Sequence, residues 1–256
     1  TINIANSTDM NYAKGGALYW PGSNGKIEHC DFDKSTARSD GAAVYVSGND
    51  TDILNSNFIY YNSTNGSGGA LYVEGNNVEI KDTTFDMGCV NRSGGAVYIK
   101  GSNVHIRDST ITHNHAGISG GSIYIEGDDA KIVGSTVMLT YTLSGHGGSI
   151  YVKGDRTVVD HSNFTNSSSK EIEGASDIVL GGAMYVEGDD TNITYARFQY
   201  ASATRGGAIY IQGHNIHVSH SNFVNLGSTR ATMNQSGVNA DAWGGAIYVG
   251  GDDAVI

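Results

Sequence analysis

The chain has 256 residues and combines 36 glycines with a single proline, Pro21. Its formal net charge of −11 disfavours nucleic acids and acidic membranes as partners, because both attract basic surfaces. The sequence contains no basic cluster and no run of about 18 apolar residues, so we expect no membrane-spanning segment in it.

A short motif, Gly-Gly-Ala-aliphatic-Tyr-aliphatic or a close variant, recurs nine times along the chain. Six of the eight spacings between successive copies are 25 to 27 residues, and the other two are 34 and 38. A repeat of this length is typical of a solenoid, in which each repeat forms one coil stacked on the last. The copies begin at Gly15, Gly41, Gly68, Gly94, Gly120, Gly147, Gly181, Gly206 and Gly244.

Each repeat, numbered from its first glycine, predicts three short strands in chain order. The first covers positions 3 to 7, the second positions 11 to 13, and the third is centred on position 18; in the first repeat these are residues 17–21, 25–27 and the neighbourhood of Phe32. Side chains alternate between the two faces of a strand, so the aliphatic positions 4 and 6 share an inward face. The runs are too short and too rich in β-branched residues for helices.

We therefore predict an all-β fold, a right-handed single-stranded parallel β-helix with three strands per coil. About nine coils of 25–27 residues would stack with a rise of about 4.8 Å each, and two coils would carry loop insertions. Neither end of the sequence resembles a polar cap, so we expect residues 1–256 to be one solenoid segment of a longer protein, uncapped at both ends.

Position 5 is tyrosine in every repeat and should face outward, beside small residues at position 3. The rings would then form a column, which either stabilises the sheet by stacking or offers an accessible aromatic platform to a sugar or protein partner. Both roles can coexist. The candidate binding residues from this column are Tyr72, Tyr98, Tyr124, Tyr151, Tyr185 and Tyr210.

The two long spacings insert residues at the same place in the coil, after the third strand. Only one coil separates the insertions, so both loops should emerge on the same side, either as tolerated surface loops or as a paired recognition site. Their candidate binding residues are Glu171, Glu173 and Asp177 in the first loop and Arg230, Asp241 and Trp243 in the second.

We expect no resident cofactor or metal site. Aspartate and asparagine follow the position-8 glycine in most coils, as at Asp128 and Asp129. They are typical of tight turns, with calcium bound to stacked oxygen ligands as the alternative. Cys30 and Cys89 lie at least two coils apart in this fold, so we expect no disulfide between them.

Asparagines in Asn-x-Ser/Thr triplets permit surface glycosylation in an extracellular protein. The candidates are Asn6, Asn49, Asn62, Asn65, Asn91, Asn163, Asn166, Asn192 and Asn234.

The repeat resembles that of the adhesin-like surface proteins of methanogenic archaea, and it is also similar to the repeats of chlamydial polymorphic outer membrane proteins. The pattern is clearest at Gly206-Gly207-Ala208-Ile209-Tyr210-Ile211, followed by Ser221-Asn222-Phe223. The archaeal match is better because tyrosine follows the aliphatic residue throughout. The resemblance implies a secreted β-helix at the cell surface that is used in attachment, and it supplies no catalytic residues.

We therefore expect a non-enzymatic, extracellular attachment protein with surface glycans or surface proteins as partners. One alternative is a structural subunit of a surface layer or filament, in which copies associate end to end through open strand edges. A polysaccharide lyase or glycosidase is a further alternative, since such enzymes also use β-helices. It would need carboxylates that converge in a groove, with Glu171, Glu173, Asp177, Arg205 and Asp241 as the candidates.

Overall fold

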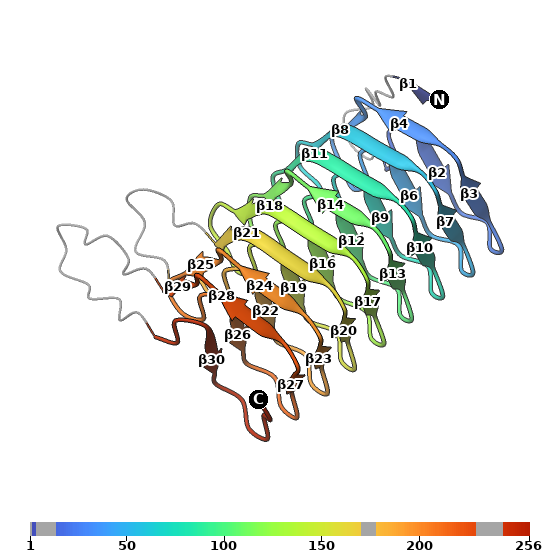
Figure 1. Cartoon of the computed structure of the whole chain (residues 1–256). Coiled ribbons are helices and arrows are strands. Elements are labelled where there is room, and N and C mark those ends of the chain that lie inside the picture. Colours follow the sequence, from blue (N-terminus) through green and yellow to red (C-terminus); the bar gives the residue numbers. More distant parts are fainter. Residues whose placement is uncertain (1, 4–13, 170–177, 229–242) are drawn as a thin grey trace.

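A computed structural model describes residues 2–3, 14–169, 178–228 and 243–256. Every element in this part of the chain is a β-strand, and the strands form three parallel sheets that run the length of a rod of stacked coils (Figure 1). The middle sheet contains eight strands, which corresponds to about eight complete turns. The predicted all-β parallel solenoid is therefore confirmed, and the nine copies of the glycine motif supply the nine strands of one sheet.

The first sheet, which we call the tyrosine sheet, takes its strands from the residues that follow the glycine pair of each coil. Its strands are β2 (Leu18–Trp20), β6 (Val44–Val46), β9 (Leu71–Val73), β12 (Val97–Ile99), β16 (Ile123–Ile125), β19 (Ile150–Val152), β22 (Met184–Val186), β26 (Ile209–Ile211) and β30 (Ile247–Val249).

The middle sheet contains the second strand of each coil. Its strands are β3 (Lys26–Glu28), β7 (Asp52–Leu54), β10 (Glu79–Lys81), β13 (His105–Arg107), β17 (Lys131–Val133), β20 (Val158–Asp160), β23 (Asn192–Thr194) and β27 (His217–Ser219).

The third sheet, the phenylalanine sheet, contains the strands centred on position 18 together with several shorter strands. Its strands are β1 (Ile2–Asn3), β4 (Asp31–Asp33), β5 (Thr36–Ala37), β8 (Asn57–Ser63), β11 (Thr84–Val90), β14 (Thr110–Thr112), β15 (His115–Ala116), β18 (Thr136–Thr142), β21 (Asn163–Ser169), β24 (Arg197–Gln199), β25 (Ser202–Ala203), β28 (Asn222–Val224) and β29 (Gly227–Ser228).

The third strand of a coil extends further than the sequence predicts. In β11 the pairing continues past Met87, whose φ of 60° lies in the left-handed region, and Cys89 and Val90 pair with the next coil. The corresponding residue is also left-handed in the other described coils, for example Lys34 and Leu139. Glycine and asparagine normally mark such a residue, so a bend occupied by Lys, Met or Leu gave no signal in the sequence.

The core is built from like residues that stack on one another. Register places each residue opposite the residue at the same position of the next coil, as for Ile99 and Ile125. Phe32, Phe58 and Phe85 stack inside the rod with ring centroids 4.7 Å and 4.9 Å apart. These side chains and the inward aliphatic residues of the tyrosine sheet form one continuous apolar cluster, as positions 4, 6, 13 and 18 predict.

Each glycine of the pair is required for a different physical reason. Gly94, the first of its pair, has a φ of 67°, and a Cβ there would lie 2.4 Å from the carbonyl oxygen of Val97. A Cβ on Gly95 would lie 2.0 Å from the carbonyl oxygen of Gly121 in the next coil. Any other residue would strain the bend at the first position and separate the coils at the second.

A buried polar network joins Tyr61 to Asn114 inside the rod. The hydroxyl of Tyr61 donates to Oδ1 of Asn114 at 2.6 Å, two coils away, and the backbone N–H of Gly88 donates to the same oxygen at 2.8 Å. Nδ2 of Asn114 donates to the carbonyl oxygen of Phe85 at 3.3 Å. Gly88 makes room for this contact, since a Cβ there would lie 2.0 Å from the Tyr61 ring.

Replacing Asn114 with alanine should destabilise the rod because it leaves two buried donors, the Tyr61 hydroxyl and the Gly88 N–H, without an acceptor. We expect a loss of about 1–3 kcal/mol in the free energy of unfolding for each unsatisfied group, measured by urea denaturation. Tyr61→Phe is the matched control, because it removes one donor and leaves the Gly88 contact intact, and it should cost less. Equal unfolding midpoints for Asn114→Ala and the wild type would contradict this assignment.

Candidate functional site

The tyrosines of the repeat form one continuous stack on the outer face of the tyrosine sheet. From Tyr19 to Tyr248, neighbouring ring centroids lie 4.7–5.4 Å apart. None of these rings belongs to the apolar core, so their outward direction is confirmed. Stacking at this distance covers the ring faces with neighbouring rings, which leaves ring edges and hydroxyls toward solvent.

The expectation that all rings are accessible is wrong at two places. Tyr45 is 1% exposed and Tyr185 is 5% exposed, although neither lies in the core. Each is covered by the residue that directly precedes the glycine pair of the coil before it, which we call the cover residue. Lys14 lies 4.3 Å from the ring centroid of Tyr45 and its ammonium donates to the Tyr45 hydroxyl at 2.7 Å, while His146 stacks on Tyr185 at 5.1 Å.

The cover is missing where the cover residue is serine, at Ser67, Ser93 and Ser119. A groove of about 250 Å³ lies at this part of the stack. We call it the tyrosine groove, and its lining residues are Asp40, Ser67, Tyr72, Arg92, Ser93, Tyr98, Ile118 and Tyr124. Lys14 and His146 bury the rings that they cover, whereas Ser67 and Ser93 are too small to cover Tyr98 and Tyr124 in the same way.

The small residues at position 3 do not open the groove, contrary to expectation. Ala70 and Ala96 are fully buried and belong to the core. They precede the first strand residue of their coils, β9 and β12, and follow the bend at the glycine pair. The strand alternation therefore does not extend back to them, and serine at the cover position has the role that the sequence analysis gave to alanine.

The tyrosine hydroxyls follow a pattern with a period of two coils. The residues at position 7 alternate in charge through Glu74, Lys100, Glu126, Lys153 and Glu187, which avoids like charges directly opposite each other. Tyr45 donates to Glu74 at 2.6 Å and Tyr98 donates to Glu126 at 3.0 Å.

The lysines complete this row of charges. Lys100 pairs with Glu74 at 3.0 Å, and Lys153 pairs with Glu126 at 3.6 Å. The coil that follows Tyr72 and the coil that follows Tyr124 both carry lysine at position 7. Among the described residues, the hydroxyls of Tyr72 and Tyr124 therefore have no hydrogen-bond acceptor.

Two opposite charges line the tyrosine groove. One carboxylate oxygen of Asp40 accepts a hydrogen bond from the backbone N–H of Ser67 at 2.9 Å, which fixes the side chain. The exposed guanidinium of Arg92 forms no ion pair with any described residue. Burial is the first cause that raises the pKa of the Tyr72 hydroxyl, Asp40, Glu74 and Glu126 raise it further, and Arg92 opposes this rise. The groove thus offers an acidic group, a basic group and free hydroxyls within one small space.

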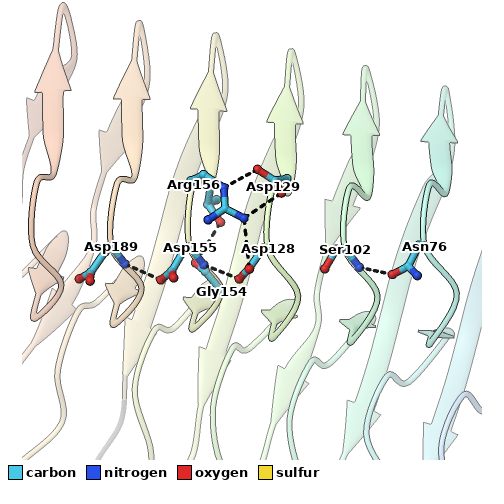
Figure 2. A network of polar contacts seen from close by, with 9 residues as sticks. Asn76, Ser102, Asp128, Asp129, Gly154, Asp155, Arg156 and Asp189 are labelled. Carbon is cyan, nitrogen blue, oxygen red and sulfur yellow. Dashed lines mark hydrogen bonds and ion pairs between the residues drawn. The ribbon is translucent and has the colours of Figure 1, made fainter.

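The acidic corner after the position-8 glycine uses its own oxygens to join the coils (Figure 2). Asp128 accepts from the backbone N–H of Asp155 at 3.0 Å, and Asp155 accepts from that of Asp189 at 2.9 Å. Arg156 pairs with Asp129 at 2.8 Å and with Asp128 at 3.2 Å, and it lowers the pKa of the Asp129 carboxyl. Within the described residues, no group of three or more His, Cys, Asp or Glu side chains is arranged to hold a metal ion.

The other predicted site residues do not lie in the groove. Tyr151, Tyr185 and Tyr210 continue the stack beyond it, and Trp243 is 45% exposed at a cover position, where it lies 4.4 Å from the guanidinium of Arg205. The residues that fall outside the described part of the chain are Glu171, Glu173, Asp177, Arg230 and Asp241.

Five lining residues of the groove were not predicted from the sequence: Asp40, Ser67, Arg92, Ser93 and Ile118. The signal that could have found the groove is the side-chain size of the residue before each glycine pair, which is small in three successive coils. Asp40, Ser67 and Ser93 hold that position, and Arg92 and Ile118 lie two residues before a glycine pair.

Cys30 and Cys89 are free, as expected from their separation. No helix in the described segments is long and apolar enough to cross a membrane. Seven of the nine candidate glycosylation asparagines lie in the described segments, and all seven are exposed: Asn49, Asn62, Asn65, Asn91, Asn163, Asn166 and Asn192. Asn6 and Asn234 lie outside these segments.

The stacked tyrosines, which are wholly or partly buried, should make the rod less stable at alkaline pH. Burial is the first cause that raises the pKa of Tyr124 and of Tyr185 to about 12, against about 10 in an unfolded chain. The folded state then holds protons that the unfolded state releases, so this stabilisation is complete below about pH 10 and is lost as the pH rises toward 12. We expect the urea midpoint to fall above about pH 10.

The control for this pH dependence is the double variant Tyr72→Phe/Tyr124→Phe, which removes the two hydroxyls that lack acceptors. Its urea midpoint should fall less steeply with pH than that of the wild type. A wild-type midpoint that stays constant between about pH 9 and pH 11.5 would contradict the assignment.

Replacing His146 with serine should open the stack at Tyr185 in the way that Ser93 leaves it open at Tyr124. The Tyr185 ring is 5% exposed, so removing its cover should make it accessible to a reagent that modifies exposed tyrosines. The rate of nitration of Tyr185, followed by mass spectrometry with the covered Tyr45 as the internal reference, would measure this change. An unchanged nitration rate would show that His146 is not the cover.

Comparison with known proteins identifies the fold. A search of curated proteins finds no match. The chain is similar in structure to HetL, a pentapeptide repeat protein involved in the regulation of heterocyst differentiation in the cyanobacterium Nostoc sp. strain PCC 7120, at 6% identity over 90% of each chain, but the TM-score of 0.27 is too low to show a shared fold. The family model of the right-handed β-helix region matches residues 1–137, which is more than half of the 256 residues. The chain therefore belongs to the right-handed β-helix family.

Proposed function

We propose that this chain is a non-enzymatic attachment module of an extracellular, cell-surface protein, and that the tyrosine groove is where a surface glycan or surface protein binds. The observation that carries the proposal is the groove at Tyr72, Tyr98 and Tyr124, where Asp40, Ser67 and Ser93 stand in place of a large cover residue. A large side chain covers the stack at Tyr45 and at Tyr185, where the cover residues are Lys14 and His146. A purely structural stack gains stability from cover along its whole length, so an uncovered stretch favours a role in binding.

The rod suits attachment because it is rigid and extended. Consecutive coils pair in register through three sheets along the axis. Such a scaffold holds the lining residues, which come from several coils, in fixed relative positions. A preorganised site loses little conformational entropy when a partner binds.

The groove chemistry supports binding without catalysis. Hydrolysis of a glycosidic bond normally requires two carboxyl groups that flank the bond. Asp40 is the one acidic residue in the groove lining, and its carboxylate is already held by the Ser67 N–H. The surface location is supported by the resemblance of the repeat to adhesin-like proteins and by the exposure of the seven described glycosylation candidates.

The double variant Ser67→His/Ser93→His tests the proposal by covering the groove in the way that His146 covers Tyr185. We expect the intact rod to bind surfaces that carry its partner and the covered variant to lose at least about tenfold in affinity, because a filled pocket excludes a ligand. Adhesion of the labelled protein to cells of its own species, and to immobilised surface glycans and proteins, is the measurement.

Ser168→His is the matched control, because it would extend the stack of His115 and Tyr141 on a different sheet. It should bind as the wild type does, and all variants should unfold at the same temperature. If the covered variant adheres as well as the wild type, the groove is not the attachment site and a structural role becomes the better conclusion.

A further inference from the structure

We propose that the tyrosine groove binds a single neutral sugar residue, held by hydrogen bonds to Asp40, Arg92 and the tyrosine hydroxyls rather than by stacking on an aromatic face. This inference rests on the proposed function and names the ligand class of the same groove. Aromatic residues would be expected to bind a sugar through their ring faces, whereas here the ring edges and hydroxyls would bind it.

Stacking of a ligand on the tyrosines is excluded by the geometry of the rings. Tyr72, Tyr98 and Tyr124 lie 4.8 Å apart, with angles of 3° and 7° between neighbouring ring planes, so each inner ring has another ring on both faces. A ligand in the groove therefore meets ring edges and hydroxyl oxygens. The volume of about 250 Å³ is below the roughly 300–1,000 Å³ of pockets for drug-sized ligands, which suits one sugar ring.

The polar groups of the groove require a ligand that both donates and accepts hydrogen bonds. Asp40 can only accept, and Arg92 can only donate. The hydroxyls of Tyr72 and Tyr124 can do both, and no described residue accepts from them. A sugar presents several neighbouring hydroxyls, each of which is donor and acceptor, so one sugar residue can satisfy all of these groups without carrying a charge.

Ile118 supplies the remaining surface of the groove. It is 46% exposed, which is unusual for an isoleucine in this well-packed rod. The carbon-bound hydrogens of a sugar ring form an apolar face that can cover this side chain. The combination of one apolar contact with several polar groups is typical of a small-molecule site that fixes the orientation of its ligand.

The charges around the groove favour a neutral ligand over an anionic one. Asp40 lies in the groove. Glu74 and Glu126 lie at position 7 of their coils, where they accept hydrogen bonds from the hydroxyls of Tyr45 and Tyr98. These carboxylates raise the pKa of Tyr72, which shows that they disfavour a second negative charge at that hydroxyl. Arg92 in turn disfavours a simple cation. A dipolar ligand, such as a peptide with free termini, is the competing class of ligand, and the test includes a probe for it.

The test is ligand-observed NMR on the intact chain with a panel of small probes. The neutral probes are the methyl glycosides of glucose, galactose, mannose and N-acetylglucosamine. Methyl glucuronide is the anionic probe, and glycylglycine is the dipolar probe. We expect at least one neutral glycoside to bind and the other two classes to bind at least about tenfold more weakly.

The variants Asp40→Asn and Arg92→Gln should each weaken that neutral glycoside by at least about tenfold, as expected for the loss of one charge-assisted hydrogen bond. Arg197→Gln is the matched control, because Arg197 is an exposed arginine on β24 of the phenylalanine sheet. It should bind as the wild type does. Ser93→His should abolish binding, since it would place a ring over Tyr124.

Binding of no neutral glycoside, or tighter binding of glycylglycine or methyl glucuronide, would overturn the inference. So would equal binding by Asp40→Asn and the wild type. These failures differ from a failure of the proposed function: if covering the groove abolishes adhesion while no neutral glycoside binds, the groove is the attachment site and its ligand is not a neutral sugar.

Discussion

In-register stacking of consecutive coils is the constraint on which the whole structure depends. Parallel strand pairing places each residue opposite the residue at the same position one coil later, so every side chain has its own counterpart as a neighbour. Apolar and aromatic residues gain from this arrangement, as the phenylalanine and tyrosine stacks show. Charged residues do not, and position 7 therefore alternates between glutamate and lysine. The same rule gives the core its single apolar cluster and explains why a coil has no stability on its own.

The candidate site results from a local departure from this regularity. Repetition would cover the tyrosine stack evenly, but the cover residue changes from Lys14 and Asp40 to the serines Ser67 and Ser93, and later to His146. The loss of a few side-chain atoms in successive coils adds up to one groove because the coils are in register. The charged lining residue Arg92 occupies the position that Gly66 occupies in the coil before it. The repeat thus builds the scaffold, and the irregular positions give the site its chemistry.

Much of the fold could be predicted from the sequence because the pattern repeats at the level of single positions. Aliphatic residues at positions 4 and 6 and phenylalanine at position 18 fix the core in every coil. The tyrosines of the site belong to the repeated motif and were predicted, but Asp40, Ser67, Arg92, Ser93 and Ile118 come from different coils and lie outside that motif. The Tyr61–Asn114 contact escaped for a similar reason: it joins residues 53 positions apart through the gap left by Gly88, a relation that only the geometry of stacked coils reveals.

Stacking also decides how such a rod can recognise anything. A single exposed aromatic ring can offer its face to a ligand, but a ring within a continuous stack has given both faces to its neighbours. Repeating an aromatic residue in every coil therefore strengthens the scaffold and at the same time removes the surface by which aromatic residues usually bind. Recognition then depends on what lies around the ring edges: the hydroxyls, the charges of Asp40 and Arg92, and the space left by Ser67 and Ser93. A β-helix of this kind can acquire a new site by changing the residues that precede its glycine pairs, without disturbing the core or the register.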